Sequence, residues 1–224
     1  MKDQRKGSEG MDVFVIGAGG HSKIVLEILE EDPSINIKGL LDDNKALHGK
    51  QVMGYPILGA IDGMGHLFSK GIGFVISIGN NGLRCRLADR LKDLGFHQVS
   101  AISKHAVISG KARVGAGVII NPGVVIHPDV TIDDDVVLGM NATISHDSVI
   151  GRGAHLSPGV HITGNARVGA LADLGAGVVV IPQRSVGEGT IVGAGAVVTK
   201  DLPQGVVAVG APAKPIKSLK EPKE

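Results

Sequence analysis

The sequence predicts two domains of different fold class: an N-terminal α/β domain with a small parallel sheet, and a C-terminal parallel β-helix built on a six-residue repeat. Strands alternate with helices up to residue 100, branched aliphatic residues recur at every sixth position from residue 102, and 34 of the 224 residues are glycine. The expected boundaries are a disordered leader over 1–10, the α/β domain over 11–100, the β-helix over 101–200, and a C-terminal cap and tail over 201–224.

The N-terminal half has the strand–helix–strand order of a βαβ unit. Asp12–Ile16, Ile35–Leu41 and Phe74–Ile78 are short apolar runs rich in β-branched residues, which predicts buried strands. Ser22–Glu31 has helical spacing of its apolar residues, with Ser22 as the expected N-cap, and Arg84–Leu94 is expected to form a second helix. Alternating elements of this kind predict a parallel sheet.

The repeat in the second half keeps its phase over seventeen positions. Each of these holds Ile, Leu or Val: Ile102, Ile108, Val114, Ile120, Ile126, Ile132, Leu138, Ile144, Ile150, Leu156, Ile162, Val168, Leu174, Val180, Val186, Val192 and Val198. The residue four places later is nearly always small, with Arg184 as the bulky exception. We expect the aliphatic to point inward on each side of a triangular coil, so that 18 residues make one coil and coils stack about 4.8 Å apart.

Composition excludes several classes of function. The net charge is +1 and the chain has five Phe and Tyr residues with no Trp, so neither electrostatics nor base stacking favours nucleic-acid binding. No apolar stretch approaches the roughly 18 residues that span a bilayer, so membrane insertion is not expected. The only cysteine is Cys85, which excludes an internal disulfide and indicates a reducing, cytoplasmic location.

Within the repeat, His146 stands out because of its neighbours. It occupies the third position of its hexad, outside the expected interior, with Asp147 directly after it and Asn141 five residues before. A neutral imidazole accepts a proton at cellular pH, and an adjacent carboxylate makes it more basic. This arrangement suits a general base that deprotonates an amine attacking a thioester. The plainer alternative is a solvent-exposed His–Asp pair.

A second histidine, His155, lies nine residues after His146, which is half of an 18-residue coil. Within one chain the two imidazoles therefore belong to different sides of the prism. They can serve one substrate only if another copy of the chain supplies one of them. We therefore expect a homotrimer with its active sites between subunits.

The segment Gly17-Ala18-Gly19-Gly20-His21 follows a strand and opens a helix, where backbone N–H groups favour a phosphate. A dinucleotide fingerprint requires a third glycine at the position that Ser22 occupies, so the motif is incomplete. Asp42 lies near the place expected for a ribose-binding acid. An NAD-dependent function therefore stays open.

GAGGH at the first turn, SHD in the coil (residues 145–147) and AHLSPG after it resemble the bacterial nucleotide-aminosugar N-acetyltransferases of the NeuD/PglD type. These include bacillosamine- and perosamine-pathway enzymes, with sialic acid O-acetyltransferases as relatives, and the resemblance covers roughly residues 12–216. It implies a Rossmann-like N-terminal domain and a left-handed β-helix. It also implies a cytoplasmic acetyltransferase that acts on the amino group, at C4, of a nucleotide-linked aminodeoxysugar in surface-glycan or exopolysaccharide biosynthesis.

The resemblance assigns roles to individual positions. It makes His146 the general base, with Asp147 as its acidic neighbour and Asn141 near the reacting centre. Bacillosamine-type enzymes have Glu at the neighbouring position, so the shorter Asp departs from that pattern. Acetyl-CoA, as co-substrate, is expected to contact five positions: His155, Gly164, Ala176, Ala194 and Lys214. No metal is expected.

The resemblance places the nucleotide-sugar substrate on the N-terminal domain, with its base near Asp42 and Asp43 and its diphosphate or sugar near His21. The expected contacts are Gly17, Gly19, Gly20, His21, Asp42, Asp43, Gly79 and Asn80. Carboxylates beside a diphosphate would repel it, which supports placing both aspartates at the base and ribose.

Three other functions remain as alternatives. An O-acetyltransferase acting on sialic acid or another sugar would use the same donor and base on a hydroxyl acceptor. A γ-carbonic-anhydrase-like enzyme needs three imidazoles converging on zinc, and no third partner for His146 and His155 is evident. An ice-binding solenoid would carry a regular threonine array, whereas threonines here are scattered.

Overall fold

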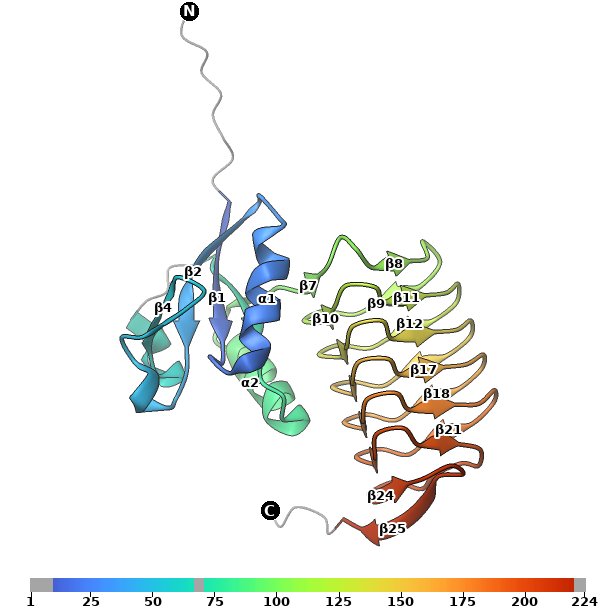
Figure 1. Ribbon diagram of the computed structural model, residues 1–224. Helices are drawn as coiled ribbons and strands as arrows, with labels where there is room; N and C mark the ends of the chain where they lie inside the picture. Colours follow the sequence, from blue (N-terminus) through green and yellow to red (C-terminus); the bar gives the residue numbers. More distant parts are fainter. Residues whose placement is uncertain (1–9, 67–70, 220–224) are drawn as a thin grey trace, which may run out of the picture.

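The computed structural model describes residues 10–66 and 71–219, so the expected leader lies outside the described residues except for Gly10, as does the end of the tail. An α/β domain stands beside the upper part of a long β-solenoid (Figure 1). The elements of the first domain are β1 (Met11–Ile16), α1 (Gly20–Glu30), β2 (Ile35–Leu41), η1 (Lys45–Leu47), β3 (Gln51–Val52), β4 (Tyr55–Gly59), η2 (Ile61–His66), β5 (Gly73–Ile76), α2 (Asn81–Asp93) and β6 (His97–Gln98).

The sheet of the first domain has the order β3-β4-β2-β1-β5-β6, with β1 parallel to both of its neighbours. Side chains of β1 alternate between two cores: Val13 and Val15 pack with α1, whereas Phe14 and Ile16 pack with Leu87 and other residues of α2. The period-two alternation thus places the two helices on opposite faces of the sheet.

Both helices begin earlier than the sequence indicated. Gly19, not Ser22, is the N-cap of α1, because Gly19 is extended while residues from Gly20 onward are helical. Ser22 is buried, and its hydroxyl donates to the Gly19 carbonyl at 2.7 Å. Asn80 caps α2 by accepting a hydrogen bond from Leu83 N at 2.8 Å, so the helix gains a turn ahead of Arg84. β5 ends at Ile76, two residues before the predicted end of its strand.

From residue 101 the chain forms two-residue strands joined by turns. They are β7 (Ala101–Ile102), β8 (Val107–Ile108), β9 (Arg113–Val114), β10 (Ile119–Ile120), β11 (Val125–Ile126), β12 (Thr131–Ile132), β13 (Val137–Leu138), β14 (Thr143–Ile144), β15 (Val149–Ile150), β16 (His155–Leu156), β17 (His161–Ile162), β18 (Arg167–Val168), β19 (Asp173–Leu174), β20 (Val179–Val180), β21 (Ser185–Val186), β22 (Ile191–Val192) and β23 (Val197–Val198). β24 (Val206–Val209) adds a parallel strand, and β25 (Lys214–Ser218) pairs with it antiparallel.

From β7 to β23 the strands form three parallel faces in which each residue pairs with the one 18 places later, as Val125 does with Thr143. We name the faces by their strands: the first contains β7, β10, β13, β16, β19, β22, β24 and β25, the second β8, β11, β14, β17, β20 and β23, and the third β9, β12, β15, β18 and β21. The first corner joins the first and second faces, the second corner joins the second and third, and the third corner leads back to the first. The period of 18 confirms the three-sided coil.

The inward-pointing residues form one continuous core. Hexad aliphatics from Ile120 to Val198 are nearly all fully buried, and small residues such as Val118 and Ala142 fill the space beside them. The first hexad is an exception, since Ile102 is 41% exposed where an inward position was expected. The first coil has no coil before it, so its aliphatic lacks one of the two neighbours that bury the others.

Candidate active site

His146 lies in the second corner, directly after β14, and its side chain is 57% exposed. Its Nδ1 lies 2.7 Å from Asp147 Oδ2, and because an ionised carboxylate can only accept, Nδ1 donates that hydrogen bond. The lone pair of the neutral ring is therefore on Nε2. A Cβ atom built on Gly164, one coil further, would lie 2.7 Å from Nε2, so only glycine leaves room for this ring position.

Asp147 owes its position to the backbone of the corner. Its φ of 60° is in the left-handed region, which Asp and Asn tolerate better than most residues. The same corner carries left-handed residues 18 positions apart: Asp129, Asp147, Asn165 and Gln183. The repeat therefore supplies the turn that places the carboxylate beside the imidazole.

Asn141 lies in the first corner, at the other end of β14 from His146. It is exposed, has a φ of 58°, and its side chain packs over Gly123 of the coil before. The structure therefore does not bring Asn141 beside His146 within one chain, and its predicted place near the reacting centre stays a prediction.

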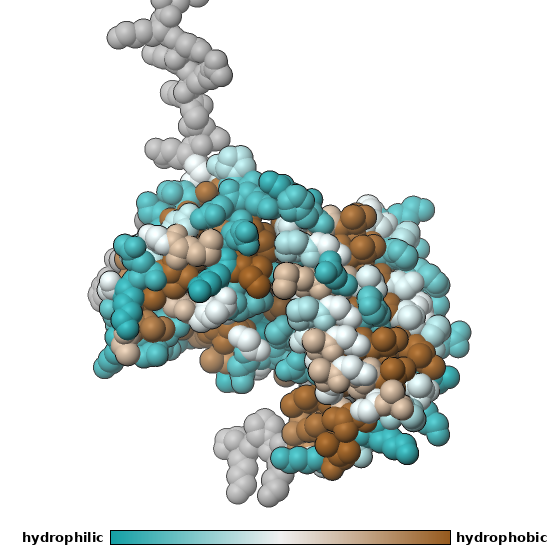
Figure 2. Space-filling model, in the orientation of Figure 1, coloured by the Kyte–Doolittle hydropathy of each residue, from teal (hydrophilic) through white to brown (hydrophobic). Residues whose placement is uncertain are grey.

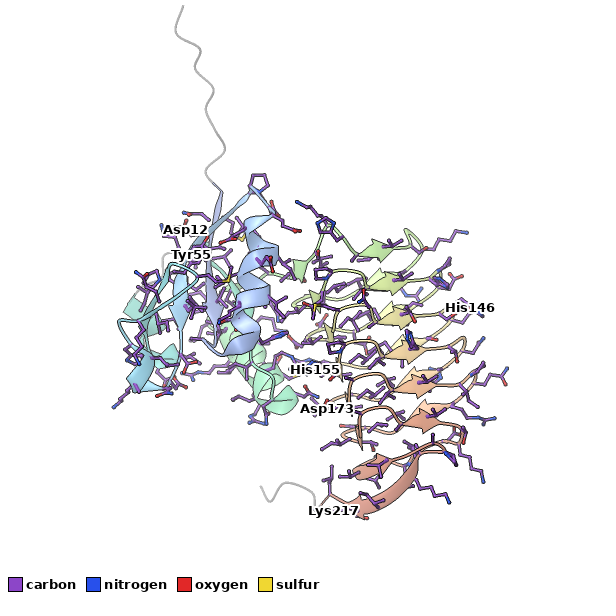
Figure 3. The ribbon with its side chains drawn as sticks, in the orientation of Figure 1. Asp12, Tyr55, His146, His155, Asp173 and Lys217 are labelled. Carbon is purple, nitrogen blue, oxygen red and sulfur yellow. The ribbon has the colours of Figure 1, made fainter. Side chains whose placement is uncertain are left out.

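His155 is on β16 of the first face, pointing toward the N-terminal domain, whereas His146 lies on the far side of the solenoid (Figure 3). The two imidazoles belong to different faces, as their spacing in the sequence predicts. The ring of His21, at the start of α1, lies beside that of His155, with centroids 6.2 Å apart.

Both rings of this pair are kept neutral. Burial, with smaller contributions from His155 and Arg84, lowers the pKa of His21 to about 4. Burial and then Arg84 lower the pKa of His155 to about 4, partly offset by its hydrogen bond to the backbone of Gly79. His21 Nε2 is buried and has no hydrogen-bond partner among the described residues. We call the contact between the N-terminal domain and the solenoid the seam. The two neutral imidazoles of this pair lie there.

The positions expected to hold acetyl-CoA are distributed over separate parts of the solenoid. Gly164 is in the second corner against His146, whereas Ala176 and Ala194 are exposed and stacked 18 residues apart in the first corner. Lys214 is exposed at the start of β25. Because Gly164 and the two alanines lie in different corners of the solenoid, we expect surfaces from two copies to form the site.

The glycine loop folds as a phosphate-binding turn would. Gly17 has a φ of +98°, and a Cβ there would collide with Ile78 Cγ1 at 2.9 Å. A Cβ on Gly19 or Gly20 would meet open space, so the N-terminal turn of α1 is accessible to a ligand.

The two aspartates behind this loop already have structural partners. Asp42 accepts hydrogen bonds from Ala18 N and Asn44 N, both at 2.8 Å, through different oxygens. Asp43 accepts one from Ile61 N at 2.9 Å. The carboxylates therefore shape the loops around the candidate nucleotide site, and direct contact with a base or ribose stays a prediction.

Gly79 and Asn80 join β5 to α2 beside the solenoid. The Asn80 side chain is used as the α2 cap, and Gly79 meets His155 through its backbone. The structure thereby brings the predicted substrate loop next to the predicted cofactor contact.

Sequence reasoning missed the polar residues that join the domains. Arg84 is 1% exposed and donates to the carbonyls of Asp135 and Gly153 in the solenoid. Arg152 bridges Asp89 of α2 and Asp135, at 2.6 and 2.8 Å. The sequence pattern that could have indicated burial of Arg84 is its position on the apolar face of its helix, which Leu87, Ala88 and Leu91 continue.

Within residues 10–66 and 71–219, no group of three or more His, Cys, Asp or Glu side chains is arranged to hold a metal ion. None of the helices in this part of the chain is long and apolar enough to cross a membrane.

An α/β domain followed by a hexapeptide-repeat solenoid is the architecture of one class of acetyltransferases. The model of the PglD N-terminal domain matches residues 12–91, and the model of six bacterial transferase hexapeptide repeats matches residues 111–146. PerB from Caulobacter crescentus, solved with CoA and GDP-perosamine, is 38% identical with a TM-score of 0.85, over 91% of this chain and 96% of that one. The chain therefore belongs to the NeuD/PglD-type family of sugar acetyltransferases, and its solenoid is a left-handed parallel β-helix.

Further similarities agree with this assignment. The acetyltransferase domain of PglB from Neisseria gonorrhoeae, solved also with acetyl-CoA, is 31% identical with a TM-score of 0.86, over 92% of this chain and 100% of that one. Galactoside O-acetyltransferase from Lactococcus lactis is 54% identical over 39 residues, which is 17% of this chain and 19% of that protein. The chain spans only about a fifth of the length of the curated relatives it matches.

Proposed function

We propose that the protein transfers the acetyl group of acetyl-CoA to the C4 amine of a nucleotide-linked aminodeoxysugar. The observation that carries this proposal is the orientation of His146, whose Nδ1 bonds Asp147 and whose Nε2 lies over Gly164 at the outer edge of the solenoid. The similar structures with bound CoA, acetyl-CoA and GDP-perosamine support the choice of donor and acceptor class.

In the proposed reaction, His146 Nε2 takes a proton as the amine nitrogen attacks the thioester carbonyl. A C–N bond forms and the C–S bond breaks, and the departing thiolate takes up a proton to leave CoA. Asp147 holds the Nδ1 proton, which fixes the tautomer and stabilises the imidazolium that forms. The glycine loop at Gly17–Gly20 and the loop at Gly79–Asn80 hold the nucleotide diphosphate and the sugar. Transfer is direct, because Cys85, the only thiol, is buried in the other domain.

We further propose a homotrimer, in which His146 of one copy faces His155 of the next. The separation of the two imidazoles on different faces of one chain supports this arrangement. Apolar side chains gather at the C-terminal end of the solenoid (Figure 2), where Ile191, Val209 and Ile216 are 40%, 39% and 65% exposed. Apolar patches of this kind mark association surfaces.

A role in surface-glycan or exopolysaccharide synthesis follows from the same substrate class and stays a prediction. A cytoplasmic location likewise stays a prediction that the free thiol of Cys85 supports. Acetylation of a sugar hydroxyl is the second candidate, because the segment shared with galactoside O-acetyltransferase is 54% identical.

An acceptor panel with acetyl-CoA tests the function. GDP-perosamine, a UDP-linked 4-amino-4,6-dideoxy sugar and the matched 4-hydroxy sugars are compared by release of the CoA thiol. We expect turnover with an amino sugar and none with its hydroxy counterpart. Turnover with hydroxy sugars alone would replace the proposal by O-acetylation.

The base is tested by His146→Ala. We expect kcat to fall by about 100-fold or more, with the affinity for acetyl-CoA and the oligomeric state unchanged. His161→Ala is the matched control, since His161 lies on β17 of the second face, where its ring bonds the Thr143 hydroxyl. A near-normal rate in His146→Ala would remove His146 from the role of base.

A further inference from the structure

The N-terminal turn of α2 is hydrogen-bonded to one corner of the solenoid at three successive coils. Arg84 donates from Nε to the Asp135 carbonyl at 2.9 Å and from Nη2 to the Gly153 carbonyl at 2.7 Å. Asn81 Nδ2 donates to the carbonyls of Leu171 and Ala172 at 3.1 and 3.3 Å. The contacts therefore span about 10 Å along the solenoid axis, or two coil spacings.

The acceptors form a regular column. Asp135, Gly153 and Leu171 are 18 residues apart in the third corner, with φ values of 60°, 66° and 58°. The left-handed backbone turns each corner in the same way, so it presents equivalent carbonyls at equal spacing. Arg84 and Asn81 thus bond a repeated feature of the β-helix. If α2 docked one coil further along the solenoid, both side chains would move by about 4.8 Å.

The same two side chains hold the loop of the proposed sugar-nucleotide site. Arg84 Nη1 donates to the Ile78 carbonyl and its Nη2 to Asn81 Oδ1, both at 3.0 Å. Ile78 directly precedes the Gly79–Asn80 loop. The loop, the helix start and the third corner of the solenoid are therefore tied together through one guanidinium.

This connection places the Gly79–Asn80 loop beside the coil that carries His155. His155 follows Gly153 by two residues on the same coil, and it bonds the backbone of Gly79. Asp173 follows Leu171 in the same way and is the register partner of His155 on the next strand (Figure 3). Arg84 and Asn81 thus bond the third corner, and this corner leads directly to the strand that carries His155.

Charge pairing does not explain why an arginine is buried here. Its four hydrogen bonds within the described residues all go to neutral oxygens, while the Asp135 carboxylate is taken by Arg152 and Gln98. Burial lowers the pKa of Arg84, so the site opposes the charge. The planar guanidinium is instead the side chain that can reach both domains with a fixed geometry.

We propose that Arg84 and Asn81 are positioning residues that set the register of the Gly79–Asn80 loop on the β-helix, and thereby the place of the sugar amine relative to the acetyl group. This inference rests on the proposed function. A loop that is bound but displaced holds the nucleotide at normal affinity with the amine out of reach. Removing the hydrogen bonds of Arg84 or Asn81 should therefore lower kcat more than it changes the KM for the sugar nucleotide or the KM for acetyl-CoA.

The test uses the full-length variants Asn81→Ala and Arg84→Lys, with Arg152→Gln as the control. Arg152 lies in the same seam and pairs with Asp89 and Asp135, but it does not bond the loop. Steady-state kinetics with GDP-perosamine and with the UDP-linked 4-amino sugar are combined with amide hydrogen exchange of residues 78–83.

We expect Asn81→Ala and Arg84→Lys to lower kcat about tenfold or more, with both KM values within about threefold of wild type. Exchange of the loop amides should accelerate about tenfold. Arg152→Gln should lower thermal stability while leaving kcat and loop exchange unchanged. If Arg84→Lys fails to fold, Asn81→Ala decides the question.

Wild-type kcat in Asn81→Ala, a loss confined to KM, or an equal loss of kcat in Arg152→Gln would each overturn the positioning role. A wild-type protein that acetylates neither amino sugar contradicts the proposed function instead. Hydrogen exchange then still tests whether Asn81 holds the Gly79–Asn80 loop in place, since unchanged exchange in Asn81→Ala would refute that role.

Discussion

At the residue scale, the position of the His146 ring depends on the absence of a side chain at Gly164. A methyl group there would lie 2.7 Å from Nε2 and 2.8 Å from Cε1, closer than real Cβ atoms approach. The ring would have to rotate away from Asp147 or toward solvent. Catalytic groups lose efficiency steeply when they move by about 1 Å.

We therefore expect Gly164→Ala to lower kcat about tenfold or more while leaving thermal stability nearly unchanged. Gly110→Ala is the control, because a Cβ at Gly110 meets nothing within 4 Å and its backbone is not left-handed. Acetyl-transfer rates and melting temperatures of the two variants provide the measurement. Equal kcat in both variants would show that the ring does not need this space.

The two seam histidines make stability depend on pH. The folded protein holds His21 and His155 with a pKa of about 4, against about 6.5 in the unfolded chain, so the unfolded state binds more protons between these values. Their contribution is complete above pH 6.5 and is lost as the pH falls toward 4. The upper limit is about 3 kcal/mol for each imidazole.

Denaturant unfolding between pH 4 and 7.5 measures this effect. We expect the free energy of unfolding to rise with pH over this range, and His155→Asn to flatten the slope. Asp173, whose pKa burial raises, contributes an opposite slope near its own titration. His127→Asn, which makes the same chemical change at an exposed position of the solenoid, is the control. An identical slope in His155→Asn would contradict the assignment.

At the scale of an element, the second corner repeats a left-handed residue in four successive coils. Asp129, Asp147 and Asn165 occupy it with side chains that tolerate this backbone, whereas Gln183, with a φ of 61°, has no such preference. The corner therefore carries a small local strain at Gln183 that is absent from the coils before it.

We expect Gln183→Asn to stabilise the protein by about 0.5 kcal/mol, which raises the melting temperature by about 1–2 °C. Gln204→Asn makes the same chemical change at an exposed position whose φ is not in the left-handed region. Calorimetry on both variants distinguishes a backbone effect from a general effect of the substitution. A lower melting temperature in Gln183→Asn alone would show that its longer side chain has a contact worth more than the strain.

At the scale of the whole molecule, a site shared between copies predicts complementation. His146→Ala and His155→Ala remove residues from opposite sides of the proposed cleft, so each variant alone should be inactive. In a mixed trimer, some clefts combine the intact His146 of one variant with the intact His155 of the other. Each mixed trimer contains one restored cleft among its three.

Co-expression with two affinity tags and activity assay of the doubly purified protein measures this recovery. The double variant His146→Ala/His155→Ala, mixed with wild type, controls for subunit exchange alone. Activity near a third of wild type in this doubly purified protein supports sites between subunits. No recovery in verified mixed trimers would place both histidines in one copy's site and contradict the proposal.

The sequence by itself determined the solenoid and the His146–Asp147 pair. The six-residue period acts locally, because every coil repeats the same inward aliphatic, small neighbour and corner, and each coil contacts only the next. His146 and Asp147 are adjacent in the chain, and the spacing to His155 follows from the same period. Three strands of the first domain, β1, β2 and β5, were predicted for the same reason, whereas the short edge strands β3, β4 and β6 were not predicted.

The tertiary structure alone decided what meets at the seam. His21 and His155 are far apart in the chain, and Arg84 bonds residues of the solenoid that no periodic pattern relates to α2. Ile102 is exposed although it follows the repeat, because burial depends on having a coil on either side. Docking of two domains rests on long-range hydrogen bonds and desolvation, and a local pattern carries no information about either.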